Sequence, residues 1–182
     1  MLKWLKTRAE NHRKADKLYG AVVTQALSGH IYASLGAPDT PAGRYEIVVL
    51  HLFLVLERLR DEPGIGQVLP RLLVERFVSD MDDSLRELGT GDLAVPKKVR
   101  RAADGLYERV TAYRSAVSTD DASALAQMLA SYVFLSEDAD WRSTALARYA
   151  AKTKVALVRQ DAGAISAGEI AFPDASPSKE DV

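Results

Sequence analysis

The stretch IVVLHLFLVL, residues Ile47–Leu56, decides the fold of this chain. All of its residues are apolar except His51. A membrane-spanning helix needs about 20 such residues, so this stretch is too short to cross a bilayer. We interpret it as the middle of a buried helix that runs from about Pro41 to Asp61. A helix that is apolar on nearly all its faces belongs in the centre of a fold, and we place it there.

Proline and glycine divide the rest of the chain into segments whose apolar residues recur at helical spacing. No convincing run alternates apolar and polar residues as a half-buried strand would. The sequence therefore predicts an all-α fold, a single-domain helical bundle of about six helices. Gly89 is expected to end the third helix, and Asp120 and Asp140 to cap the fifth and sixth. The expected helices span about 2–35 (as one helix or two), 41–61, 65–88, 96–117, 123–135 and 141–159.

The composition is that of one globular domain without cysteine chemistry. The chain has 182 residues, of which 47% are hydrophobic, 27% are charged and none is cysteine. A domain of this size can bury roughly 70% of its unfolded surface, so its core needs neither a metal nor a disulfide. The lack of cysteine excludes thiolate catalysis, iron–sulfur clusters and cysteine-based zinc sites.

Charge is distributed unevenly between the two ends of the chain. Residues 1–17 contain six basic and two acidic side chains, a net charge of +4, whereas residues 161–182 contain one basic and five acidic, a net charge of −4. Glycine, serine, proline and acidic residues dominate the end of the chain, which predicts disorder. We expect a basic N-terminal segment (1–18), a helical domain (19–162) and a disordered acidic tail (163–182). Without an apolar secretory signal, we expect a soluble protein.

Two motifs lie in the middle of the sequence. The first is RYEIVVLHLFL, Arg44–Leu54, followed by ERLR at Glu57–Arg60. The second is FVSDMDDSLRELG, Phe77–Gly89, which continues as TGDLAVPKK at Thr90–Lys98. Together with tyrosines 19, 107 and 113, these motifs resemble the core of the bacterial ubiquinol-cytochrome c chaperone family. The resemblance covers about residues 19–117.

This resemblance implies an all-helical, non-enzymatic assembly chaperone without a cofactor. Mitochondrial members of the family bind newly made cytochrome b near the ribosome and the inner membrane, and they act with a small partner subunit. We therefore expect the protein to promote assembly of the ubiquinol-cytochrome c reductase complex and to bind cytochrome b. We expect it in the cytoplasm, peripheral to the inner face of the inner membrane, with no DNA partner. Such a chaperone should carry an apolar groove on its surface.

Several residues of the two motifs are candidates for contact with a client or partner. His51 is either a core histidine held by a backbone carbonyl or a nearby acid, or a client-facing group. The basic residues after Pro96 lie at a helix N-terminus, where cations oppose the helix dipole, which favours a role in binding an acidic client, lipid phosphate or ribosomal RNA over a merely solvated face. The candidates are Arg44, Tyr45, His51, Asp80, Asp82, Asp83, Asp92, Lys97 and Lys98.

The acidic cluster suggests an alternative function. Asp80, Asp83 and Glu87 share one helical face and could bind Mg²⁺, as in a magnesium-dependent prenyl-diphosphate enzyme. Such an enzyme needs a second Asp-rich helix, which the sequence lacks, and a deep cavity that faces the acids. We therefore predict no metal site and no catalytic residues. The acids should instead be solvated, contact a partner, or pair with Arg76 and Arg86.

The N-terminal segment is a candidate for membrane or ribosome contact. Lys3, Trp4, Lys6 and Arg8 combine positive charge with an aromatic ring that suits the headgroup level of an anionic bilayer. The alternative is that Leu5, Ala9 and Leu18 pack on the domain. The two basic regions also leave open a third function, that of a ribosome- or RNA-binding module.

Overall fold

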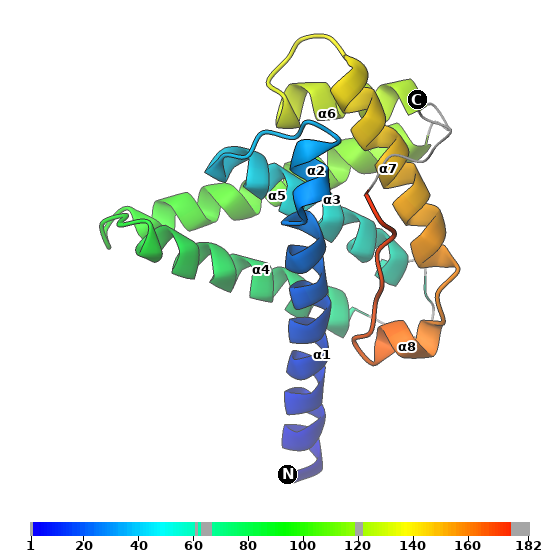
Figure 1. Ribbon diagram of the computed structural model, residues 1–182. Helices are drawn as coiled ribbons and strands as arrows, with labels where there is room; N and C mark the ends of the chain where they lie inside the picture. Colours follow the sequence, from blue (N-terminus) through cyan, green and yellow to red (C-terminus); the bar gives the residue numbers. More distant parts are fainter. Residues whose placement is uncertain (1, 61, 63–66, 119–121, 176–182) are drawn as a thin grey trace.

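Helices account for all regular structure in the described part of the chain (Figure 1). The structure is a computed structural model that describes residues 2–60, 62, 67–118 and 122–175. The predicted all-α fold is confirmed. The helices are α1 (Leu2–Ala26), α2 (Gly29–Ala33), α3 (Pro41–Arg60), α4 (Val68–Glu87), α5 (Val95–Ser118), α6 (Ala122–Val133), α7 (Trp141–Val158) and α8 (Ala162–Ser166).

Six of these helices match the predicted segments. The other two, α2 and α8, are short helices of five residues each. The first predicted segment is two helices, since α1 ends at Ala26 and α2 begins after Ser28. Helix α8 was not predicted, because its five residues lie at the end of the chain, where glycine, serine, proline and acidic residues predict disorder. The predicted start of the third helix near 65 lies outside the described residues. Helix α3 begins at Pro41, as predicted.

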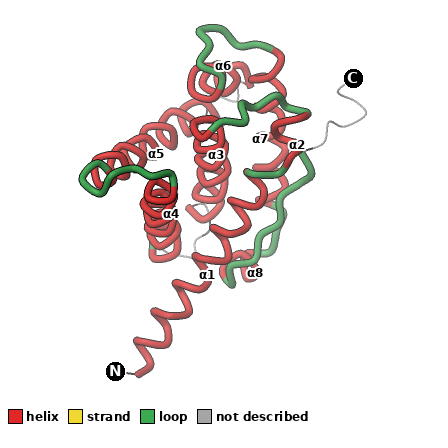
Figure 2. Tube along the Cα trace, turned by 60° about the vertical axis from the view of Figure 1, so that its left-hand side comes forward, coloured by secondary structure: helices red, strands yellow, loops and turns green. Residues whose placement is uncertain are grey.

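Helix α3 lies at the centre of the bundle (Figures 1 and 2). It packs against α1, α4, α5, α6 and α7. Every residue from Ile47 to Val55 is buried, including polar His51, so the apolar stretch forms the centre of the core as predicted. Neighbouring helices cover this stretch on all sides because none of its faces could remain in water without losing hydrophobic stabilisation.

Two predicted helix ends have the expected geometry. Gly89 adopts a positive φ of 75° after α4, and the amide of Thr90 donates to the carbonyl of Leu85 over 3.0 Å, as in a Schellman C-cap. The carboxylate of Asp140 caps α7 by accepting from the amides of Arg142 and Ser143 at 2.9 and 3.1 Å. The third predicted cap, Asp120, lies outside the described residues.

The chain after α7 is ordered as far as residue 175, which corrects the prediction of disorder from Gly163 onward. Ile165 is fully buried, and the ring of Phe172 lies 5.4 Å from that of His51. The side chain of Gln160 exchanges two hydrogen bonds with the backbone of Ala171, at 2.6 and 2.9 Å. These apolar contacts and hydrogen bonds attach the segment to the rest of the fold. We call residues 167–175 the C-terminal strap; residues 176–182 lie outside the described part.

The proposed boundary between residues 18 and 19 falls inside a continuous helix. Leu18 and Ala15 of α1 are buried in the core, so this part of α1 belongs to the domain. The N-terminal half of α1 extends away from the other helices in both views (Figures 1 and 2). Side chains 6–10 are all exposed there.

Candidate functional site

Two buried carboxylates of α3 hold α5 in place. The guanidinium of Arg109 donates to Glu46 over 2.8 and 3.0 Å, and that of Arg114 donates to Glu57 over 2.6 Å. Burial raises the pKa of Glu46, and the hydrogen bonds from Arg109 oppose this rise. Sequence reasoning missed both pairs. The available signal was a glutamate on each side of the apolar stretch, since a buried carboxylate requires a partner.

His51 is a structural group of the core. Its Nδ1 atom lies 2.8 Å from the carbonyl oxygen of Ile47, and its Nε2 atom lies 2.8 Å from the hydroxyl of Tyr149. Burial lowers the pKa of His51 to about 4, so the ring is neutral near pH 7. The interpretation as a core histidine bound to a backbone carbonyl is confirmed. The alternative of a client-facing group is wrong, because no part of the side chain is accessible.

The acidic residues of α4 are divided among separate partners. Asp80 accepts from the hydroxyl of Tyr19 at 2.9 Å and lies 3.8 Å from Arg76. Arg86 joins Asp82, at 2.6 Å, to Asp92, at 2.8 Å. Of the three alternatives for these acids, pairing with Arg76 and Arg86 holds for Asp80 and Asp82, whereas Asp83 and Glu87 are exposed. Within the described ranges, no three histidine, cysteine or acidic side chains gather in a way that could hold a metal ion.

The turn between α4 and α5 brings other predicted residues to the surface. Lys97 and Lys98 are exposed, and the ammonium of Lys98 lies 3.2 Å from the hydroxyl of Thr90. Asp83 of α4 is also exposed. Leu93, in the turn itself, is fully accessible. This turn lies at one extremity of the molecule (Figure 2). It combines exposed charge with an exposed apolar side chain.

The remaining predicted residues do not join that turn. Arg44 is exposed and pairs with Asp39 at 2.6 Å. Tyr45 is half-buried and donates to the carbonyl of Ala102 over 2.8 Å, so it anchors the start of α3 to α5. Lys6 and Arg8 are exposed on the projecting part of α1, whereas the side chains of Lys3 and Trp4 lie outside the described residues. Of the alternative packing residues there, Leu18 is buried and Ala9 is exposed; the side chain of Leu5 is not described.

An open groove of about 810 Å³ runs between α4 and α5, and we call it the α4–α5 groove. Its floor is apolar, and Tyr107 stands 60% exposed within it. Its rim mixes both charges: Arg71 pairs with Glu75 at 3.0 Å, and Arg60 lies 2.8 Å from Glu57. The sequence shows the apolar stripes of both helices but not that they leave this space. Among its lining residues are Leu56, Pro70, Val74, Val78, Ala103, Tyr107, Val110 and Arg114.

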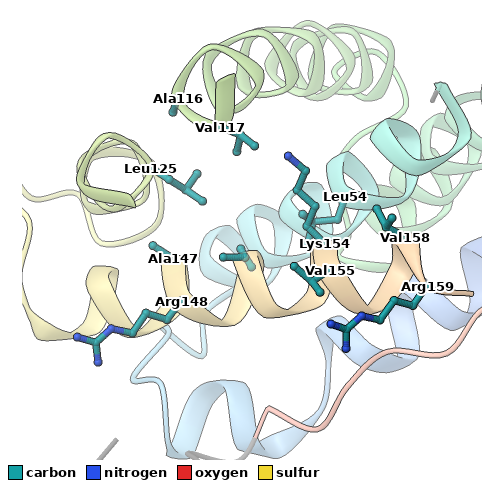
Figure 3. A pocket seen from close by; sticks show the side chains of 12 residues that line it. Leu54, Ala116, Val117, Leu125, Ala147, Arg148, Lys154, Val155, Val158 and Arg159 are labelled. Atoms are coloured by element: carbon teal, nitrogen blue, oxygen red, sulfur yellow. The ribbon is translucent and has the colours of Figure 1, made fainter. Parts of the chain in front are cut away.

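A second groove, of about 460 Å³, lies where α5, α6 and α7 meet, and we call it the α5–α7 groove (Figure 3). Its walls are almost entirely aliphatic and its charged residues are all basic. Neither groove is lined by Asp80 or Asp83, so these acidic residues of α4 face neither of them. The lining residues of the α5–α7 groove are Leu54, Ala116, Val117, Leu125, Ala147, Arg148, Ala150, Ala151, Lys154, Val155, Val158 and Arg159.

Comparison with known proteins identifies the family of this helical domain. Residues 33–172 match the ubiquinol-cytochrome C chaperone family, which is more than half of the chain. The chain belongs to this family. The match continues through α6, α7 and most of the C-terminal strap, and so extends well beyond residue 117, where the resemblance noted in the sequence ends.

One solved structure and one mouse protein are similar to this chain. The crystal structure of the Cbp3 homolog from Brucella abortus superposes with a TM-score of 0.82 and is 34% identical, covering 96% of this chain and 98% of that one. The mouse ubiquinol-cytochrome c reductase complex assembly factor 1 is 22% identical over 107 residues, 59% of this chain. The matched part is 36% of the mouse protein. In the described residues of this chaperone-family protein, no helix is long and apolar enough to cross a membrane.

Proposed function

We propose that this protein promotes assembly of the ubiquinol-cytochrome c reductase complex by binding newly made cytochrome b, and that it catalyses no reaction. Membership of the chaperone family supports the assembly role, as does the likeness to a mouse protein named as an assembly factor of that complex. The pairing of Asp80 and Asp82 with tyrosine and arginine side chains supports the absence of catalysis, because paired acids are poorly placed to hold magnesium.

The α4–α5 groove is the observation that supports client binding best. It is open, its floor is aliphatic, and Tyr107 offers an exposed aromatic ring beside that floor. A groove of this kind accepts the apolar face of an amphipathic helix, whose anchors recur every three or four residues. Arg71 and Glu75 on the rim can meet polar residues of either charge on the same helix. The client in this proposal is a helical segment of cytochrome b that has not yet found its place in the complex.

The exposed charged residues are proposed to position the protein rather than to hold the client. Lys6 and Arg8, on the projecting half of α1, are suited to an anionic membrane surface or to ribosomal RNA. Lys97 and Lys98, at the far end of the α4–α5 hairpin, are suited to an acidic protein partner. Arg44, Asp83 and Asp92 complete the set of accessible charged candidates, for a client or for a small partner subunit. The proposed location is the inner face of the inner membrane.

A deletion strain and one groove variant test the proposal. Loss of the protein should lower cytochrome b and ubiquinol-cytochrome c reductase activity while other respiratory enzymes persist. In a strain that carries Tyr107→Glu, less cytochrome b should co-purify with the protein, because the new charge would be buried by a bound apolar helix. The matched control is Leu135→Glu, which alters an exposed apolar side chain outside the α4–α5 groove.

The outcomes separate the function from its site. Normal reductase activity in the deletion strain would contradict the assembly role. Equal recovery of cytochrome b with Tyr107→Glu, Leu135→Glu and the unaltered protein would contradict the α4–α5 groove as the client site. Circular dichroism of each variant shows whether the helical fold is retained.

A further inference from the structure

The α5–α7 groove has a floor built mainly of small side chains. Ala116, Ala147 and Ala150 are buried at its base, and Val155 and Val158 are at least half exposed along α7. Because the side chain of alanine is a single methyl group, this part of the groove surface is smooth. A groove of this kind lacks the separate pockets into which the side chains of a docked helix would insert. Its volume of about 460 Å³ lies within the range typical of sites for small ligands, about 300–1,000 Å³.

The charged side chains that line this groove have one sign only. All three charged lining residues are basic, namely Arg148, Lys154 and Arg159. Helix α7 contains four basic residues and no acidic residue, and α6 contains no charged residue. Within the described part of the chain, neither Lys154 nor Arg159 forms an ion pair with an acidic side chain. The groove is therefore an apolar channel whose charged lining residues are all cations, and cations attract anionic groups.

Lys154 is the basic residue that lies over the channel. Figure 3 shows its side chain extending from α7 across the groove toward Val117 of α5, while the guanidinium groups of Arg148 and Arg159 point away from Val117. The stem of a lysine packs on apolar surface while its ammonium remains in water. An anionic group at the mouth of the groove would meet this ammonium, and an attached hydrocarbon chain would lie on the aliphatic floor.

An apolar channel with a cation at its mouth fits an amphiphile with an anionic head. The competing occupant is the end of a membrane-spanning helix, and charge argues against it. The cytoplasmic ends of such helices carry an excess of lysine and arginine, which the basic rim would repel. An anionic phospholipid has a negative charge that complements the basic rim, and its hydrocarbon chain is narrow. The membrane surface supplies such lipids.

We propose that the α5–α7 groove binds one acyl chain of an anionic phospholipid, with the lipid phosphate held by Lys154. This site is separate from the α4–α5 groove and goes beyond the proposed client binding. It would give the protein a direct attachment to an anionic membrane, independent of the projecting half of α1. Neither Val155 nor Val158 is needed to close the core, so both remain available to the lipid.

The test uses soluble single-chain lipids and the full-length protein. Isothermal titration calorimetry would compare lysophosphatidylglycerol with lysophosphatidylcholine of the same medium chain length, both below their micellar concentrations, and with glycerol 3-phosphate. The anionic lipid should bind roughly tenfold more tightly than the zwitterionic one, a factor that corresponds to about 1.4 kcal/mol. Glycerol 3-phosphate, which lacks the chain, should show no measurable binding.

Two groove variants and one control locate the site. Lys154→Glu should remove the preference for the anionic lipid, and Val155→Asn with Val158→Asn should weaken binding of both lipids. The control is Lys152→Glu, which makes the same charge change at an exposed position of α7 outside the groove lining, and it should retain the preference.

Four results would overturn the proposal. The first two concern the unaltered protein: it does not bind lysophosphatidylglycerol, or it binds both lipids equally. The third is that Lys154→Glu and Lys152→Glu lose the preference for the anionic lipid to the same extent. The fourth is that an acidic helical peptide, in place of the lipid, binds in a way that depends on Lys154. Cytochrome b recovery from the Lys154→Glu strain distinguishes this site from the client site. Normal recovery together with lost lipid preference supports two separate grooves, and a parallel loss of both would contradict their independence.

Discussion

The Nε2 atom of His51 lies 2.8 Å from the hydroxyl oxygen of Tyr149, so a buried hydrogen bond joins the central helix α3 to α7. The Nδ1 atom of the same ring is bonded to the carbonyl of Ile47 on its own helix. If Nδ1 carries the proton and donates to this carbonyl, Nε2 accepts from Tyr149. Phe172 of the C-terminal strap covers the ring, and Tyr149 in turn accepts a hydrogen bond from Gln25 of α1 at 2.9 Å. One imidazole therefore links three parts of the fold.

The first prediction is a loss of stability in mild acid. The pKa of His51 is about 4 in the folded protein, below the 6.5 of an unfolded histidine, because burial disfavours the charged ring. A depressed histidine pKa means that the unfolded chain binds more protons between these values. The contribution of neutral His51 to the free energy of unfolding is therefore fully present above pH 6.5. It is lost as the pH falls from 6.5 toward 4, by about 3 kcal/mol in all.

Urea denaturation at pH 7.5 and at pH 5 would measure this loss. The unaltered protein should lose more free energy of unfolding between the two values than His51→Gln, which cannot be protonated there. The variant should be less stable at pH 7.5, since the bond geometry is not reproduced. An equal pH dependence of both proteins would assign the acid sensitivity to other groups.

The second prediction concerns the buried pair of Glu46 and Arg109. Glu46→Gln leaves the guanidinium without its buried carboxylate and should cost about 3–5 kcal/mol of unfolding free energy. The double variant Glu46→Leu/Arg109→Met removes both charges and should cost less than the two single changes combined. The exposed pair of Arg71 and Glu75 is the control, and Arg71→Ala should change stability by less than about 1 kcal/mol.

The third prediction tests the C-terminal strap at Gly168. This residue has a φ of 87°, and an added Cβ would lie 2.8 Å from the backbone oxygen of Lys14. Gly168→Ala should therefore detach the strap from α1 and expose residues 167–175 to limited proteolysis. Gly20→Ala is the matched control, because a Cβ there meets nothing within 4 Å and alanine favours the helix by roughly 0.8–1 kcal/mol. Equal protease resistance of the two variants would show that the strap does not depend on this contact.

The fold was largely predictable because periodicity reports which residues are buried along a helix. The stretch Ile47–Leu56 identified the central helix, and local chemistry identified the ends at Gly89 and Asp140. The strap was missed because the end of the chain is rich in glycine, serine, proline and acidic residues, and because Phe172 packs against a ring far away in sequence. An apolar groove was expected from the family resemblance, but the positions of the two grooves were not predicted, since each is lined by residues from several helices. Pairs such as Glu57 and Arg114, which join α3 to α5, were likewise out of reach, because no single segment encodes their contact.

The fourth prediction separates binding from folding at the N-terminus. Residues 6–10 of α1 are exposed, so deletion of residues 1–8 removes little of the packing that begins near Ala15. The thermal midpoint should change little, and co-sedimentation with anionic vesicles or with ribosomes should weaken. Lys6→Glu/Arg8→Glu in the full chain serves as a second test without a deletion, and it should weaken co-sedimentation in the same way. A large fall in the thermal midpoint would instead assign these residues to the domain.

The last prediction concerns Lys97 and Lys98 at the start of α5. Both side chains are exposed, and cations at a helix N-terminus oppose the helix dipole, so their replacement should not destabilise the domain. Lys97→Glu/Lys98→Glu should raise the thermal midpoint slightly or leave it unchanged, since acidic residues suit this helix end. In a strain that carries this double variant, reductase activity should nevertheless fall, because an acidic partner would be repelled. Arg100→Glu is the nearby control for charge alone, as Arg100 is also exposed but lies farther from the turn. Helicity, cytochrome b level and reductase activity would be measured for all three proteins, and a folded double variant with full activity would reject this turn as a partner contact.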